Sequence, residues 1–158
     1  MPWKGVTVKA DTPEEIVALY QCREVMEGLG ARLCARNATP EQVAELKELC
    51  KEMHAIEDAT ARVEVNSRFH SMIAQFSGND RVVDYLADFR ERVNSDMYLS
   101  SLNAVRTHDC DDEHDHIVDA IERHDEVAAE NAMRKHINNA FIFKRANAEL
   151  QDKKLNEV

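Results

Sequence analysis

Apolar residues recur at steps of three and four along most of the chain, and this spacing places them on one side of an α-helix. The first such stripe follows residue 12, ends near residue 36 and contains Leu19, Cys22, Met26, Leu29 and Leu33. No segment shows the sustained alternation of apolar and polar residues, bounded by turn residues, that is typical of a strand. The periodicity therefore predicts an all-α bundle.

Local start and stop signals divide this pattern into six helices. Thr12-Pro13-Glu14-Glu15 and Thr39-Pro40-Glu41-Gln42 each combine an N-cap threonine, a proline at the first helical position and a Glu or Gln at the third, as in a capping box. Ser77-Gly78-Asn79 is a stop signal, because glycine suits a left-handed C-terminal cap. The expected helices cover residues 13 to about 36, 40 to about 53, about 60–76, about 80–97, about 114–121 and about 125–150.

Apolar positions also predict the inner faces of the middle helices. The third helix carries Val63, Phe69, Ile73 and Phe76, and the fourth carries Val82, Leu86, Phe89, Val93 and Met97. We expect the run Gly5-Val6-Thr7-Val8 to be an arm or the end of a strand, and the polar segment 151–158 to fray. The chain thus divides into an arm at 1–11, a helical bundle at 12–150 and a tail at 151–158.

The amino-acid composition excludes several classes of function. The 158 residues include 20 Lys+Arg and 30 Asp+Glu, a net charge of −10, and 44% are hydrophobic, which is enough for a core. The acidic balance argues against direct contact with nucleic acid or an anionic membrane, because phosphate binding relies on clustered Lys and Arg. No long apolar run or signal-peptide core occurs, so a cytoplasmic location is expected. The four cysteines form no CxxC pair, and we interpret them as reduced thiols, mostly in the core.

The seven histidines fall into two groups by their positions on the helices. His70, His114 and His136 each lie three or four residues from apolar positions of the same helix, so they should point into the bundle. His70 also follows Asn66 by one helical turn, which places both on one face. The expected solvated histidines are His108 and His116.

Three inward histidines on three helices, with an amide oxygen beside the first, make a plausible ligand set for one divalent metal ion. The alternative for each ring is a hydrogen-bonded core histidine. Neutral ligands would leave the charge of a divalent ion uncompensated. Such a site should attract an anion, typically a carboxylate, to its remaining positions.

Four segments of the chain also carry a family resemblance. They are Tyr20-Gln21-Cys22-Arg23-Glu24-Val25-Met26-Glu27, Asn66-Ser67-Arg68-Phe69-His70 with Ser77-Gly78-Asn79, Glu113-His114 with Ile117 and Ala120-Ile121, and Ala132-Met133-Arg134-Lys135-His136. Their order and spacing resemble the ligand-sensing C-terminal (FCD) domain of the FadR subgroup of GntR-type bacterial transcription regulators. The resemblance covers about residues 12–148.

The resemblance implies an antiparallel bundle of six to seven helices that forms a homodimer. It also implies a metal held by an Asp or Asn and three histidines, here Asn66, His70, His114 and His136, which binds a small organic acid. The commoner first ligand is Asp, so Asn66 is a departure that bears on metal affinity. Zn²⁺ is the favoured ion, with Ni²⁺ and Mn²⁺ as alternatives, because imidazole-rich sites bind several ions.

Three further residues are candidates for binding the organic acid. Arg23 occupies the position of the family's helix-one arginine and can meet a carboxylate bidentately, although a salt bridge with Glu27 is the alternative. Asn139 lies one turn beyond His136 and can add a hydrogen bond or be solvated. Arg90 shares a stripe with the apolar residues of the fourth helix.

Two functions remain open at this stage. The resemblance implies a metal-dependent sensor of a small carboxylate. The chain has only eleven residues where such regulators carry a winged helix-turn-helix, so we expect this chain to lack a DNA-binding domain, either as the sensor fragment of a longer regulator or as a stand-alone sensor bundle. The alternative is a stand-alone metalloenzyme, a lyase or hydrolase, because three histidines leave coordination positions for water or substrate. Glu113, beside His114, is then a candidate acid or base, although it can simply face solvent, and no catalytic residue is assigned.

Overall fold

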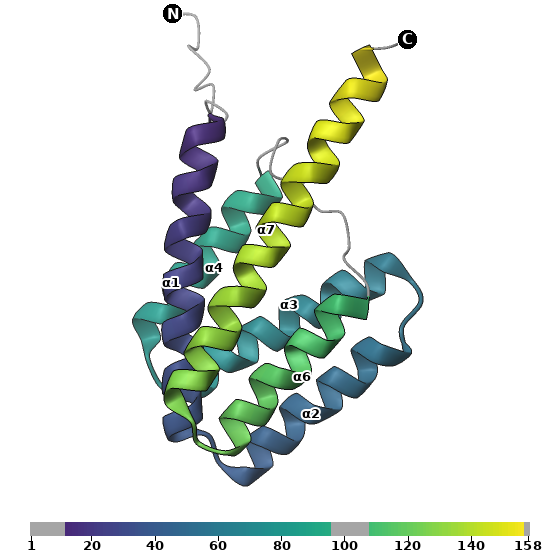
Figure 1. Cartoon of the computed structure of the whole chain (residues 1–158). Coiled ribbons are helices and arrows are strands. Elements are labelled where there is room, and N and C mark those ends of the chain that lie inside the picture. Colours follow the sequence, from purple (N-terminus) through teal and green to yellow (C-terminus); the bar gives the residue numbers. More distant parts are fainter. Residues whose placement is uncertain (1–11, 96–107, 157–158) are drawn as a thin grey trace, which may run out of the picture.

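Six α-helices and no strand are found in residues 12–95 and 108–156, the parts of the chain that the structure, a computed structural model, describes. The helices, drawn in Figure 1, are α1 (Pro13–Asn37), α2 (Pro40–Ala55), α3 (Ala59–Phe76), α4 (Asp80–Ser95), α6 (His108–Glu122) and α7 (Glu126–Asn156). The predicted all-α class is confirmed. None of these helices has both the length and the apolar character needed to cross a membrane.

The predicted capping boxes start α1 and α2. The Thr12 hydroxyl accepts from the Glu15 backbone N–H at 3.2 Å, while the Glu15 carboxylate accepts from the Thr12 N–H at 2.7 Å. Thr39 and Gln42 make the same reciprocal pair. Gly78, just after α3, has a φ of +68°, the left-handed conformation that its position in the stop signal indicates.

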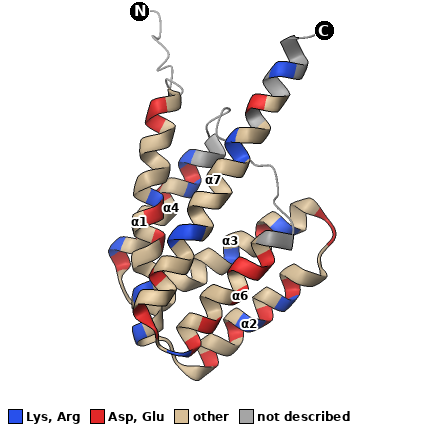
Figure 2. Cartoon of the chain, in the orientation of Figure 1, with Lys and Arg blue, Asp and Glu red and all other residues tan. Residues whose placement is uncertain are grey.

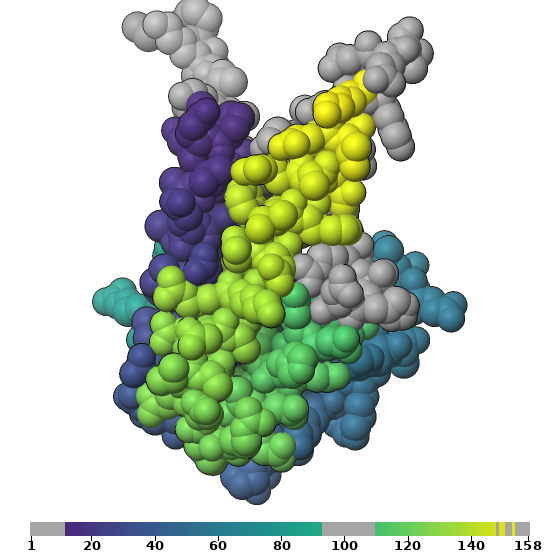
Figure 3. All heavy atoms as spheres, viewed as in Figure 1, coloured from purple at the N-terminus to yellow at the C-terminus, as the bar shows by residue number. Residues whose placement is uncertain are grey.

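α1 and α7, the first and last helices of the chain, pack against one another in antiparallel orientation (Figure 1). Ion pairs link the two helices at their surface, where Arg32 pairs with Glu130 at 3.1 Å and Arg36 pairs with Glu126 at 2.6 Å. Acidic and basic residues are interspersed along the helices (Figure 2). In the space-filling view, the outer ends of both helices project beyond the remaining bundle (Figure 3).

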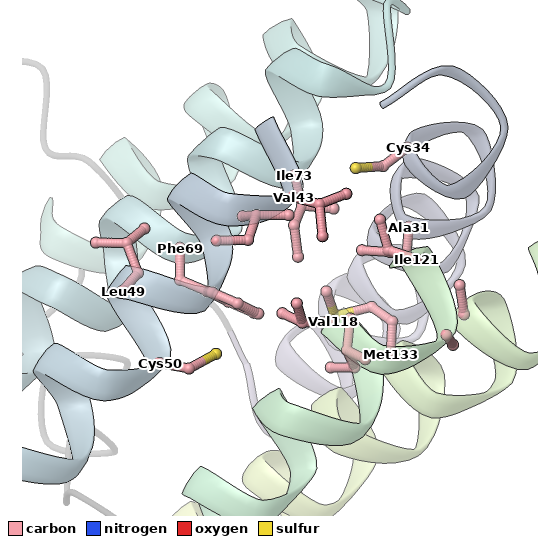
Figure 4. Close-up of a cluster of buried hydrophobic side chains, with 14 of the residues drawn as sticks. Ala31, Cys34, Val43, Leu49, Cys50, Phe69, Ile73, Val118, Ile121 and Met133 are labelled. Atoms are coloured by element: carbon pink, nitrogen blue, oxygen red, sulfur yellow. The ribbon is translucent and has the colours of Figure 1, made fainter. Parts of the chain in front are cut away.

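The main core lies where α1, α2, α3, α6 and α7 meet. Phe69 and Ile73 of α3 point toward Val118 and Ile121 of α6 and Met133 of α7 (Figure 4). Smaller clusters join α4 to the other helices, and one of them stacks Tyr20 on Phe141 with a centroid distance of 4.5 Å. These clusters hold α3, α6 and α7 in fixed positions, and each of these helices carries one inward histidine.

Two residues that were predicted to lie on inner helix faces, Val63 and Cys22, are exposed instead. Val63 is 46% exposed, because it is six residues before Phe69 and so points about 240° around the helix from it. Cys22 is exposed, since the buried face of α1 is centred on other residues, Ile16, Tyr20, Glu27, Ala31 and Cys34. The prediction of a mostly buried set of cysteines is therefore wrong for Cys22, while Cys110 is half-buried and the remaining two are buried.

Two helices are longer than predicted. α6 begins at His108, about six residues before its predicted start, and α7 continues to Asn156 through most of the predicted tail. Helix-favouring residues such as Glu, Leu and Lys in 149–155 explain the continuation. The arm at 1–11, Met97 and the side chains of Val93 and His108 lie outside what the structure describes, while His116 is exposed as predicted.

Candidate metal and ligand site

Three helices each contribute one buried histidine to a single cluster. His70 of α3, His114 of α6 and His136 of α7 each offer a ring nitrogen within 4.8 Å of the other two. The Nε2 atoms of His70 and His136 are 3.3 Å apart. Two nitrogens bound to one tetrahedral zinc ion would lie about 3.4 Å apart, given Zn–N distances of about 2.0–2.1 Å. The donor set therefore fits a divalent metal ion of this kind.

Two of these rings, those of His70 and His136, each have a carboxylate next to the Nδ1 atom. Glu27 Oε2 is 3.1 Å from Nδ1 of His70, and Glu113 Oε2 is 2.9 Å from Nδ1 of His136. Such partners fix the tautomer and orientation of a ligating histidine, so that the opposite nitrogen faces the metal. Glu113 is held in turn by Asn139, whose Nδ2 donates to Oε1 at 2.8 Å.

The electrostatics of the cluster suit metal binding. Burial lowers the pKa of His136 to about 4, against the opposing effect of Glu113, so this ring is neutral at pH 7 and keeps a lone pair for a metal. Burial alone would raise the pKa of Glu27, but the charges and hydrogen bonds of His70 and Arg23 lower it to about 2. Glu27 is therefore ionised although only 3% of its surface is exposed.

Two adjoining cavities lie beside the cluster, and His70 lines both of them. The first, which we call the histidine cavity, is lined by all three histidines together with Arg62, Cys110 and Asp111. The second, the arginine cavity, is lined by Tyr20, Glu27, Ser67, Phe89 and Arg90. Both cavities share one wall, made of Arg23, Val63, Asn66, His70 and Lys144. Asn66, half-buried one turn before His70, thus lines both cavities, and its role as a metal ligand stays a prediction.

Arg23 forms the salt bridge with Glu27 that was the alternative to ligand binding, and it also lies on the cavity walls. Its Nε and one terminal nitrogen donate to Glu27 Oε1, each at 3.2 Å, and its guanidinium lies over the Phe89 ring, 5.0 Å from the centroid. The Arg23 side chain also lines both cavities and remains 14% exposed. It can therefore meet a ligand while its pair with Glu27 is kept.

The other two predicted ligand residues differ in position. Arg90 lines the arginine cavity, and one terminal nitrogen donates to the Ser71 hydroxyl and, at 3.4 Å, to the Ser67 carbonyl. Asn139 is not among the described residues that line either cavity. Its amide instead holds Glu113 behind His136, so the structure gives it a positioning contact.

Arg62, Asp111 and Cys110 were not predicted from the sequence as site residues, and Glu27 was considered only as a salt-bridge partner of Arg23. Arg62 and Asp111 form a buried ion pair at the histidine cavity. Cys110, Glu113 and His136 form a second group of possible metal ligands. The thiol, carboxylate and ring-nitrogen atoms of these three residues lie within 4.8 Å of one another. The position of Glu27 seven residues after Tyr20 is a helical-face signal that could have identified it as inward.

Lys144 also lines both cavities without having been predicted. It lies eight residues after His136 on α7, about two turns along the same side, and this spacing is the signal that could have found it. Burial, and to a smaller extent the nearby Arg23 charge, lowers its pKa to about 8, while Cys110 opposes the shift. Lys144 is thus a desolvated cation beside the histidine cluster.

Comparison with known proteins identifies the family. Residues 18–139 match the FCD domain family. The chain is 32% identical over 134 residues to the HTH-type transcriptional repressor NanR of Enterobacter sp. (strain 638), covering 80% of this chain and 50% of the repressor. It is 29% identical over 150 residues to NanR of Escherichia coli (strain K12), covering 90% of this chain and 55% of that protein. The chain thus spans about half the length of the curated relatives it matches.

A solved structure supports the fold assignment. E. coli McbR/YncC superimposes with a TM-score of 0.75 over 89% of this chain and 72% of that chain, at 15% sequence identity. At this identity the similarity concerns the fold, which agrees with the predicted FadR-type helical bundle. The family match over residues 18–139 shows that the chain belongs to the FCD domain family.

Proposed function

We propose that this chain is the effector-binding domain of a GntR-type transcription regulator, and that it binds a small carboxylate through one divalent metal ion. Asn66, His70, His114 and His136 would hold the ion, with zinc favoured over nickel or manganese. The observation that carries the proposal is the 3.3 Å approach of two histidine Nε2 atoms, each on a ring backed by a carboxylate. The family of the chain adds the regulatory role.

Charge supports a carboxylate as the ligand. The proposed metal ligands are neutral, and Glu27 is paired with Arg23. A bound divalent ion would therefore supply positive charge that attracts a carboxylate oxygen. Arg23, on the shared cavity wall, is placed to receive the same carboxylate by a charge-assisted hydrogen bond.

Sensing requires more than binding. An effector can change the activity of a regulator only by binding two arrangements of the protein with different affinity. The site fits this role because its residues come from α1, α3, α6 and α7, so a bound acid contacts several helices at once. In this proposal the domain acts as a homodimer, and a DNA-binding partner or domain contacts the operator in place of the bundle itself.

Metal content is the first test. Protein purified without chelator or affinity-tag metal should contain about one equivalent of divalent ion by elemental analysis. His70→Ala and His114→Ala should lose the ion, whereas His116→Ala, an exposed histidine on the same helix as His114, should keep it. A metal-free wild-type protein that folds normally and binds no added zinc would contradict the proposed site.

The metalloenzyme alternative is tested with the same protein. Glu113 is hydrogen-bonded to His136 and Asn139, which favours a positioning contact over the acid or base role considered from the sequence. Zinc-loaded protein is incubated with small carboxylates, and their amounts are followed by NMR. Binding without consumption is expected for a sensor. Turnover that disappears in His70→Ala would instead identify an enzyme.

A further inference from the structure

The charges of the residues that line the two cavities do not add up to zero. Arg23 pairs with Glu27, and Arg62 pairs with Asp111, so these four residues leave no net charge. Arg90 and Lys144 form no ion pair with a carboxylate among the side chains that the structure describes. Two cations thus remain around the site in a chain whose net charge is −10.

These two cations extend the site in one direction from the histidines. Lys144 of α7 lies on the wall that both cavities share, whereas Arg90 of α4 lines only the arginine cavity. His70 is on the shared wall as well. Positively charged side chains therefore line the path from the histidine cluster into the arginine cavity. Arg23 and Lys144 lie on the shared wall, and Arg90 lies beyond them.

Both side chains retain hydrogen-bond donors for a ligand. A guanidinium has five N–H donors, and the contacts of Arg90 with Ser67 and Ser71 come from a single terminal nitrogen. These contacts orient Arg90 and leave its Nε and second terminal nitrogen available. The ammonium of Lys144 has three donors, and it is half-buried at the cavity wall. A partly buried cation without a carboxylate partner is costly unless an anion compensates it, and charge-assisted hydrogen bonds to a carboxylate would do so.

We propose that Lys144 and Arg90 bind a second carboxylate of the effector, so that the ligand is a small dicarboxylic acid. This inference rests on the proposed function, in which the first carboxylate binds at the metal and Arg23. The second carboxylate lies in the arginine cavity. Lys144 and Arg90 then determine specificity, because a monocarboxylate leaves both cations uncompensated.

Matched ligands provide the test. Malonate, succinate, glutarate and adipate are each compared with their own monoamide by calorimetry on the zinc-loaded full chain, because the amide keeps the size and removes one charge. At least one diacid should bind about tenfold or more tightly than its monoamide, as expected for hydrogen bonds between charged groups. In Lys144→Gln and Arg90→Gln this ratio should fall toward one while the monoamide affinity stays the same. Lys135→Gln, an exposed lysine on α7, should keep the wild-type ratio.

The outcomes separate this inference from the proposed function. Equal binding of every diacid and its monoamide to wild-type protein, or a ratio that both variants preserve, would overturn the second carboxylate site and leave the metal site standing. Failure to retain zinc, measured in the same samples, would remove both. Circular dichroism checks the fold of each variant, and Lys144→Met replaces Lys144→Gln if the latter does not fold.

Discussion

Glu113 illustrates how much of the site depends on residues outside the ligand set. Its two carboxylate oxygens contact His136 and Asn139 at 2.9 and 2.8 Å, so one side chain connects α6 to two successive turns of α7. A partner of this kind raises the basicity of the ligating ring and fixes its orientation. The position of His136 relative to a metal therefore depends on an acid that need not touch the ion.

Replacement of Glu113 tests this dependence. Glu113→Gln should weaken zinc binding by about tenfold, the low end of the range for such partners, because glutamine can still accept from His136 but carries no charge. Competition with a chromophoric chelator measures the change. Asp112→Asn is the matched control, since Asp112 is exposed on the same helix, and its affinity should equal that of the wild type. Equal affinities in all three proteins would show that Glu113 has no influence on the ion.

Lys144 gives a prediction about stability. Its pKa falls from 10.5 to about 8 through burial and the Arg23 charge, with Cys110 opposing, so the native state favours the neutral amine more than the unfolded state does. Below pH 8 the native protein therefore holds a destabilising charge. Lys144→Met should raise the free energy of unfolding at pH 7 by about 1–3 kcal/mol.

The pH dependence distinguishes this cause from better packing. Between pH 8 and 10.5 the native amine is neutral while the unfolded one is still charged, so the gain should shrink across this range. Urea unfolding of metal-free, reduced protein at pH 7 and at pH 10 measures both values. Lys135→Met, on the exposed face of α7, should change stability by less than about 0.5 kcal/mol. A gain of equal size at both pH values would refute the electrostatic origin.

The sequence predicted the inward histidines because each lies three or four residues from apolar neighbours, and helical geometry then fixes its direction. It did not predict the contact of Glu27 with His70. An acid four residues after an arginine is the usual pattern of a surface pair, and only the packing of α1 against α3 brings the second oxygen of Glu27 to the ring. Contacts between helices depend on tertiary distances that the period of one helix does not contain.

At the level of helices, the start of α6 is fixed by a buried ion pair. Arg62 of α3 pairs with Asp111 of α6, and a second hydrogen bond from Arg62 reaches the Met53 carbonyl at 2.6 Å, near the end of α2. Both side chains are at least 90% buried. The pair thus joins three helices beside the histidine cavity and sets the position of the turn that carries His114.

Removal of one partner should therefore be costly. Arg62→Met should lower the free energy of unfolding by about 3–5 kcal/mol, because Asp111 is left as a buried charge. The double variant Arg62→Met with Asp111→Leu should recover a large part of this loss, though not the hydrogen bond to the Met53 carbonyl. Denaturant unfolding measures both. Lys51→Met breaks the exposed pair with Glu48 and should cost less than about 1 kcal/mol, and a similar small loss for Arg62→Met would contradict the argument.

Helix starts were easier to predict than helix ends or faces. The boxes at Thr12 and Thr39 depend on residues within four positions, so the sequence contains the whole interaction. The exposure of Val63 depends instead on the relative rotation of α3 and its neighbours. The early start of α6 likewise involves a contact between helices, because Asp111 in its first turn pairs with Arg62 of α3.

For the whole molecule, a metal would connect helices that the core already holds in place. The main cluster of buried apolar residues packs α1, α2, α3, α6 and α7 together without using the three histidines. The metal-free protein should therefore be folded, unlike a zinc finger, whose fold depends on the ion. Zinc should add stability by mass action, about 2.7 kcal/mol at 100 times its dissociation constant.

In a domain of this size that gain corresponds to a rise in melting temperature of about 5–10 °C. Thermal unfolding followed by circular dichroism, with zinc and with chelator, measures it. His136→Ala should melt at the same temperature in both conditions, whereas His116→Ala should keep the wild-type difference, because its ring is exposed. The chelated wild type should retain its helical signal at low temperature. Loss of that signal would mean that the apolar core alone does not hold α3, α6 and α7 together, and that the metal is a structural rather than a sensing element.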